Sequence, residues 1–234
     1  MNIQEFHKSF LLKAEGYENL QYHDWHYVEV DYWLNEAIRM FINERFMGYK
    51  GKSFESNQKR IEDLRTLLTD KILLPIDFVT VEPASMTHIN PRANGYYFEL
   101  PSNYLIMDEE QAVYTYKGSR TFEGVTECVG DSYAFMVKNP FSEHRLKSGK
   151  AKPLRTFIDN VVELITDGNY SIEEYHIRYI RKPQVVDYNS NVSCDLNELV
   201  HNEIVEKAIT LASARAGDYN KYRISLQEET KNQI

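Results

Sequence analysis

The spacing of apolar residues changes twice along this chain, and that change constrains the fold more than any other feature. In residues 30–46 apolar side chains recur every three or four positions, which predicts an α-helix with Trp33 and Phe41 in the core. From about residue 71, short β-branched and aromatic runs alternate with turn-forming Asn-Gly and Lys-Gly pairs, which is typical of antiparallel strands. A helical period returns between Leu196 and Ala212. Helices at both ends with strands between them predict an α+β fold.

Weaker patterns predict the remaining elements. Apolar stripes at helical spacing indicate further helices at residues 2–13 and roughly 54–70, whereas residues 17–28 lack a period and are interpreted as a loop. Aspartate is a favoured N-cap, so Asp195 is expected to begin the last helix. Three of the expected strands are Ser132–Val137, Phe157–Thr166 and Glu174–Arg181. An Asp-Gly turn follows the second of these and predicts a hairpin with the third.

These elements are expected to form two domains. The N- and C-terminal helices, in residues 1–70 and 190–234, are expected to form a helical bundle that carries a C-terminal arm. Residues 71–189 are expected to form an inserted antiparallel β-sandwich or barrel. A long loop near residues 139–156 interrupts the β domain, and a loop of that length is often functional.

Composition excludes several classes of protein. The net charge is -8, whereas a DNA-coating protein needs an excess of Lys and Arg to neutralise phosphate. The two cysteines, Cys128 and Cys194, are too few for a disulfide framework or a four-ligand zinc site. No apolar run approaches the roughly 20 residues of a membrane span, and the N-terminus lacks a signal-peptide pattern. We therefore expect no membrane partner, and a chain that stays in the cytoplasm of the cell that makes it or leaves within a particle.

The sequence offers no convincing catalytic, metal or cofactor site. It contains neither a phosphate-binding Gly-rich motif nor a nucleophile elbow. His23 and His26 are the best metal candidates, but no helical period aims both at one ion, so a solvated or interfacial loop is favoured. The stretch that begins at His201 lacks the second histidine of a zinc protease. Cys194 precedes a helix and is a candidate nucleophile, although a small residue that packs at the helix entry is the favoured interpretation. No catalytic residue, metal ligand or cofactor is predicted.

Three stretches of the chain resemble segments of phage virion proteins. VDYWLNEA resembles the early helix of connector proteins in tailed phages, and the other two resemble virion ring proteins of crAss-like and related phages of Bacteroidales. The stretches are Val30–Ala37, Tyr179–Pro183 followed by Ser193–Leu196, and His201–Ala208. Asn197 stands where the pattern has proline, and Ile209 stands where it has valine.

This resemblance implies a structural adaptor and not an enzyme: a helical bundle with a β insertion, repeated around a ring that is commonly twelvefold. Such a homo-oligomeric ring lies in the head-to-tail connector of the virion, where it seals and extends the DNA channel. The implied partners are the phage portal and other tail ring proteins, and DNA passes through the channel without specific binding. The implied location is the virion, with host cytoplasm during assembly. Two alternatives remain open: a non-virion assembly chaperone or interaction module, and a phage enzyme with an unrecognised site.

Aromatic residues supply the candidates for subunit contacts. Tyrosine occurs 17 times and suits both interfaces and strands. The polar arm formed by residues 218–234 carries only a thin apolar stripe, so it is expected to be stable only against a partner. The expected interface residues are Trp25, Tyr27, Tyr219, Tyr222 and Ile224.

One basic cluster falls in the long loop. Its members are Lys147, Lys150, Lys152 and Arg155. This cluster is a candidate for a position near DNA or for contact with an acidic neighbour, although a solvated loop is the favoured interpretation.

Overall fold

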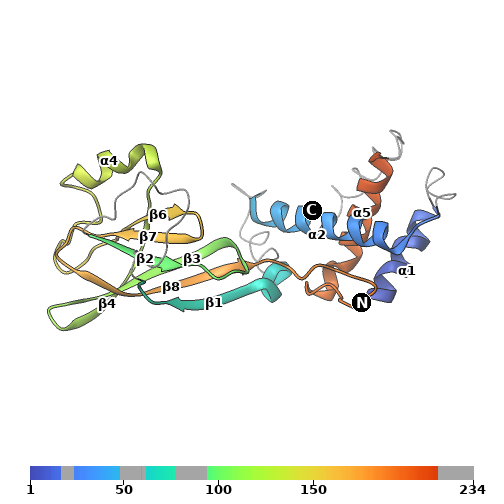
Figure 1. The fold of residues 1–234 in the computed structure, drawn as a ribbon, viewed down its shortest axis with the longest axis horizontal. Coiled ribbons are helices and arrows are strands. Elements are labelled where there is room, and N and C mark those ends of the chain that lie inside the picture. The colour runs from blue at the N-terminus through green and yellow to red at the C-terminus, as the bar shows by residue number, and fades with distance from the viewer. Residues whose placement is uncertain (17–23, 48–58, 60–61, 77–93, 216–234) are drawn as a thin grey trace. The chain divides into compact units, whose positions relative to one another are not determined.

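The computed structural model divides the chain into two compact units (Figure 1). The first unit comprises Met1–Leu67 and Lys182–Ile234, and the second comprises Leu68–Arg181. The structure describes the chain except for residues 17–23, 48–58, 60–61, 77–93 and 216–234. Helices and mainly antiparallel sheets give an α+β fold, as the sequence predicts. No helix in the described part of the chain is both long enough and apolar enough to span a membrane.

Three α-helices pack against one another in the first unit. They are α1 (Ile3–Ala14), α2 (Tyr27–Met47) and α5 (His201–Arg215), with short 3-10 turns at η1 (Arg65–Leu67) and η3 (Glu198–Val200). A capping box begins α1, because Asn2 Oδ1 accepts from the Glu5 backbone N–H and the Glu5 carboxylate accepts from the Asn2 N–H. The apolar faces meet in a core that includes Phe6, Phe10, Leu34, Phe41, Ile204 and Ile209.

Helix boundaries in the first unit differ from the sequence predictions. Helix α2 begins at Tyr27, inside the predicted loop, because the Glu29 carboxylate accepts from the His26 N–H and closes the first turn. The cap before α5 is Asn197 rather than Asp195, since Asn197 Oδ1 accepts from the Leu199 N–H at 3.1 Å. Phe41 is fully buried as expected. Trp33 is only half-buried, so its placement in the core was wrong.

Two four-stranded sheets form the second unit. The first sheet is antiparallel throughout, with the order β1 (Leu68–Leu73), β8 (Ser171–Arg181), β3 (Tyr104–Tyr116) and β4 (Ser119–Gly124). The second has the order β2 (Gly95–Glu99), β7 (Val161–Ile165), β6 (Leu154–Ile158) and β5 (Thr126–Glu127), with only β5 and β6 parallel. In each sheet the first and last strands do not pair with each other, so the predicted barrel alternative is wrong.

A shared apolar core joins the two sheets. The ring centroids of Phe98, on β2, and Tyr175, on β8, are 5.3 Å apart, and both side chains are fully buried. Aromatic packing of this kind adds to the burial of apolar area. The core includes Leu73, Ala112, Tyr114, Val162, Leu164, Ile172, Ile177 and Tyr179.

Three predictions for the second unit and its border differ from the structure. Residues 132–137 form part of helix α4 (Gly130–Lys138), whose Tyr133, Met136 and Val137 pack at helical spacing on Cys128, Leu154 and Ile165. The helix predicted at 54–70 does not extend to residue 70, because strand β1 begins at Leu68 and pairs with β8. The predicted hairpin does not form because β7 and β8 belong to different sheets. The observed hairpin joins β6 to β7 through Asp159, which has a φ of 53°.

Candidate interaction surfaces

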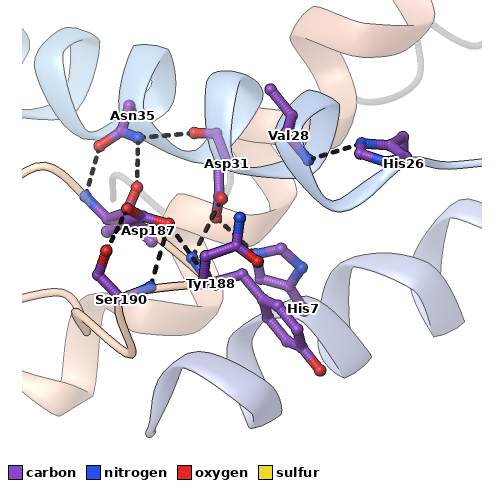
Figure 2. A network of polar contacts seen from close by, with 10 residues as sticks. His7, His26, Val28, Asp31, Asn35, Asp187, Tyr188 and Ser190 are labelled. Atoms are coloured by element: carbon purple, nitrogen blue, oxygen red, sulfur yellow. Dashed lines mark hydrogen bonds and ion pairs between the residues drawn. The ribbon is translucent and has the colours of Figure 1, made fainter.

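Asp31 connects three segments of the first unit that are distant in the sequence (Figure 2). The His7 Nε2 atom donates to Asp31 Oδ1 at 2.7 Å, and the Tyr188 backbone N–H donates to Asp31 Oδ2 at 3.1 Å. The Asp31 side chain is 13% exposed and that of His7 is 7% exposed. One carboxylate therefore fixes α1, α2 and the chain after the β unit relative to one another.

Asn35 extends this contact by one helical turn (Figure 2). Its side-chain oxygen accepts from the Val186 N–H at 2.8 Å, and its amide nitrogen donates to the Val186 carbonyl at 2.9 Å. The side-chain amide thus pairs with the backbone of buried Val186 as a neighbouring strand would. Asp31 and Asn35 together form a clamp on residues 186–188, and both belong to the VDYWLNEA stretch.

Buried ion pairs hold α2 to α5. Arg45, whose side chain is 4% exposed, donates to both Glu203 oxygens at 2.6 and 2.7 Å and to Asp63 Oδ2 at 3.0 Å. Burial raises the pKa of Asp63 and of Glu203, and the Arg45 charge opposes that rise. Lys207 is likewise buried and donates to Glu44 at 2.8 Å. These charges neutralise one another inside the unit, which gives them a structural role.

The outer face of the first sheet carries a different arrangement of charge. In one row across the sheet, Arg178 donates to Asp70 at 2.8 Å and to Glu109 at 3.3 Å. Further along the same face, Glu174 accepts from His176 and Arg120, both at 2.6 Å. The His176 hydrogen bond, with the Arg120 charge, lowers the pKa of Glu174. A hollow of about 530 Å³ lies over this face, lined in part by Asp70, Ile72, Glu109, His176 and Arg178.

Comparison with known proteins decides the family. The model of a family described as phage tail ring protein 3/4 matches residues 1–222. The chain belongs to this family of crAss-like phage ring proteins. Ring protein 4/5 of Bacteroides phage crAss001 is 30% identical over 133 aligned residues, which cover 50% of this chain and 54% of that protein. The chain thus matches about half the length of that relative. The resemblance seen in the sequence is confirmed, and the chain is a structural ring protein of a phage particle.

The aromatic interface candidates of this ring protein fall in different settings. Trp25 is half-buried with its ring edge-on to Phe10, at 5.1 Å between centroids. Tyr27 is half-buried at the start of α2, and its ring centroid is 6.1 Å from that of Tyr188. Both side chains therefore contribute to packing within the first unit. Tyr219, Tyr222 and Ile224 lie outside the described residues.

The basic cluster divides into two parts. Lys147, Lys150 and Lys152 are exposed on the loop, and the last two lie 3.8 and 3.3 Å from Glu123 and Glu143 respectively. Arg155 does not belong to the loop. It lies in β6 with 8% of its side chain exposed, paired with Glu110 at 2.7 Å and Glu127 at 3.1 Å. Its two ion pairs lie within the unit, and the expectation that Arg155 reaches DNA or a partner stays a prediction.

The long loop is ordered by specific hydrogen bonds. The Leu146 N–H donates to Asp167, and the Ala151 N–H donates to the Tyr114 hydroxyl at 2.8 Å. The Tyr170 hydroxyl donates to the His144 carbonyl at 3.0 Å. These bonds fix the loop to the β unit and leave Phe141, near Lys147, 82% exposed.

Two exposed aromatic residues were missed by the sequence reasoning. Phe135 on α4 is 72% exposed and Phe141 is 82% exposed. Large apolar side chains at such exposure are common markers of protein–protein contacts when they cluster. Phe135 was assigned to a strand, where alternation would have buried one face, so the sequence pattern gave no signal for its exposure.

The metal and nucleophile candidates are tested only where they fall in the described residues. Within the described ranges, no three His, Cys, Asp or Glu side chains gather as a metal site would require, and His23 lies outside those ranges. Burial raises the pKa of the Cys194 thiol to about 11, so the thiol is protonated at neutral pH. A nucleophilic cysteine needs the opposite shift.

Proposed function

We propose that this chain assembles into a closed ring in the head-to-tail connector of the phage, where the ring seals and extends the DNA channel. The observation that carries the proposal is the family match over residues 1–222. The proposed ring is a homododecamer. Its proposed neighbours are the portal on one side and other tail ring proteins on the other.

The composition and the division of the chain fit this role. A cyclic ring uses heterologous contacts, so each copy needs two different, complementary surfaces. We assign the first unit, with boundaries near 1–70 and 190–234, to a helical-bundle adaptor domain with a C-terminal arm that includes Tyr219, Tyr222 and Ile224. Residues 71–189 are assigned to a β-sandwich domain, and Trp25 and Tyr27 remain candidates for partner contact through their exposed parts.

Electrostatics supports a channel that DNA traverses without specific binding. The chain has a net charge of -8, and negative charge on a channel wall repels phosphate. Lys147, Lys150 and Lys152 are the exposed exceptions on the loop, and we assign them to contact with an acidic neighbour or to a position close to the DNA. A lumen lined by net basic residues would contradict this part of the proposal.

The purified chain should be examined by light scattering and by negative-stain microscopy of the same sample at several protein concentrations, alone and with the portal. We expect ring-shaped particles whose mass is twelve times the 27.5 kDa chain. Rings of another copy number would correct the stoichiometry alone. A chain that stays monomeric in both samples, and that is absent from purified particles, would contradict the ring role and favour a non-virion chaperone.

A further inference from the structure

The first sheet ends in two strands that have a partner on one side only. Strands β1 and β4 stand at opposite ends of the order β1-β8-β3-β4, and no described strand lies beyond either one. Figure 1 shows β1 running alongside β8 at the border of this sheet. An edge strand presents unpaired backbone N–H and C=O groups, which makes it a ready template for another strand.

The directions of the two edge strands match each other. Each neighbouring pair in this sheet is antiparallel, so β3 runs parallel to β1, and β4 runs opposite to β1. If a second copy continued the sheet in the same orientation, its β1 would lie antiparallel to the β4 of the first copy. Antiparallel pairing is the more stable arrangement for two strands.

The side chains of the two edges are also complementary. Ile72 and Phe122 both point away from the core face and are 57% and 51% exposed. In an antiparallel pair that places Ile72 opposite Phe122, the next position places Lys71 opposite Glu123, and both of these lie on the core face. A shift of two residues would instead place Ile72 opposite Arg120 or Gly124. One register therefore matches an apolar pair and an opposite-charge pair together.

We propose that neighbouring copies of this chain join edge to edge, with β1 of one copy pairing with β4 of the next. The inference rests on the proposed ring and identifies its two complementary surfaces. A second copy is the occupant because each copy supplies one edge of each kind, in the direction and charge that the other needs. This contact is heterologous and leaves β1 and β4 free at opposite ends until the ring closes.

Charge reversal provides the first test. Lys71→Glu and Glu123→Lys should each place like charges opposite one another and raise the concentration required for assembly by about tenfold or more. The double variant restores an opposite-charge pair and should recover assembly. Lys8→Glu is the matched control, because it makes the same change of charge at an exposed position of α1 in the first unit. Equal losses in Lys71→Glu and Lys8→Glu, or a double variant that fails to recover while its thermal unfolding is unchanged, would overturn the edge pairing.

Cysteine cross-linking tests the register independently. Within one copy, positions 72 and 122 are separated by three strand spacings, about 14 Å, which exceeds the roughly 7 Å limit for a disulfide. In the variant that carries both Ile72→Cys and Phe122→Cys, a bond between these positions therefore joins two copies. Mild oxidation should give a ladder of covalent oligomers, and each single variant should not.

The outcomes separate this inference from the ring itself. Rings with the 72–122 bond support both proposals. Rings that form normally without that bond overturn the edge pairing and leave the ring role in place. A bonded ladder that yields only open filaments supports the edge pairing and contradicts the closed ring, and a chain that neither assembles nor cross-links contradicts both.

Discussion

Two arginine–carboxylate pairs, one in each unit of this ring protein, lie in opposite surroundings. In the first unit, the Arg45 side chain is 4% exposed and its partner Glu203 is 16% exposed. In the second, Arg178 and Asp70 form a pair of similar length but are 46% and 71% exposed. A buried charge that loses its partner pays the full cost of desolvation, whereas water screens an exposed one.

This difference predicts which substitutions should affect folding and which should affect assembly. The Arg45–Glu203 and Asn35–Val186 contacts of the first unit join segments more than a hundred residues apart and are partly shielded from water, so substitutions there should act on stability. The second unit is held by the apolar core between its sheets, and the charged row on its outer face can exchange partners with a neighbouring subunit at low cost. Substitutions on that face and its edges should act on assembly.

The largest contrast should come from two arginines. Arg45→Met leaves Asp63 and Glu203 buried without their cation, and we expect it to lower the unfolding free energy by about 3–5 kcal/mol. Arg178→Met removes two exposed ion pairs, with Asp70 and Glu109, and should cost less than about 1 kcal/mol. Chemical denaturation of both variants measures the difference. Similar losses in the two variants would mean that the units do not differ as their burial indicates.

The next contrast compares two asparagines that bond to backbone. Asn35→Ala removes both hydrogen bonds to buried Val186 and should cost about 1–3 kcal/mol, because those backbone groups lose their partner. Asn160→Ala removes one longer bond, of 3.3 Å, from an exposed side chain to Leu100, and should cost less than about 1 kcal/mol. Thermal melts followed by circular dichroism give the order. A reversed order would show that the clamp does not stabilise the first unit.

A smaller effect should appear in the pH dependence. Burial lowers the pKa of one histidine in each unit, His201 in the first and His144 in the second. The folded state then binds fewer protons than the unfolded chain, so stability is complete above the ordinary pKa of 6.5 and is lost as pH falls below it. The melting temperature should decline between pH 7.5 and 5.5.

Single substitutions assign that decline to one unit. His144→Gln should flatten the pH profile of the second unit and leave that of the first, and His201→Gln should do the reverse. The quantity to compare is the change of melting temperature with pH, because each substitution also changes packing and so shifts the melting temperature at every pH. A slope that neither substitution alters would place the pH dependence elsewhere.

Local patterns predicted what depends on neighbouring residues and missed what depends on distant ones. The helical period of residues 30–46 correctly predicted helix α2 and the burial of Phe41, because the apolar face lies in one continuous stretch of sequence. The clamp could not be predicted from local sequence patterns, because Asn35 and Val186 are separated by 151 residues. The order of the first sheet was missed for the same reason, and with it the two edges.

Short segments failed for a second reason. The run at residues 132–137 is too short for its period to separate strand from helix, and its helical state is set by packing on Cys128, Leu154 and Ile165. At Leu68 the sequence has the apolar spacing of a helix, but the residue pairs with Ile180 and lies in a strand. The family resemblance succeeded despite these errors, because the motif that contains Asp31 and Asn35 is contiguous in sequence even though its contacts are not.

The smallest effect on stability should come from the loop lysines, which makes them the cleanest probe of assembly. Lys152→Ala removes a pair in which the two side chains are 47% and 60% exposed, and it should change the unfolding free energy by less than about 0.5 kcal/mol. Arg155→Ala is the contrasting control, because it removes the buried partner of Glu110 and should destabilise the second unit measurably. If the loop contacts an acidic neighbour, replacing Lys147, Lys150 and Lys152 together with alanine should weaken assembly most at low salt, where exposed charges are least screened. Unchanged assembly at every salt concentration would leave the loop solvated and confine the subunit contacts to the sheet edges and the aromatic surfaces.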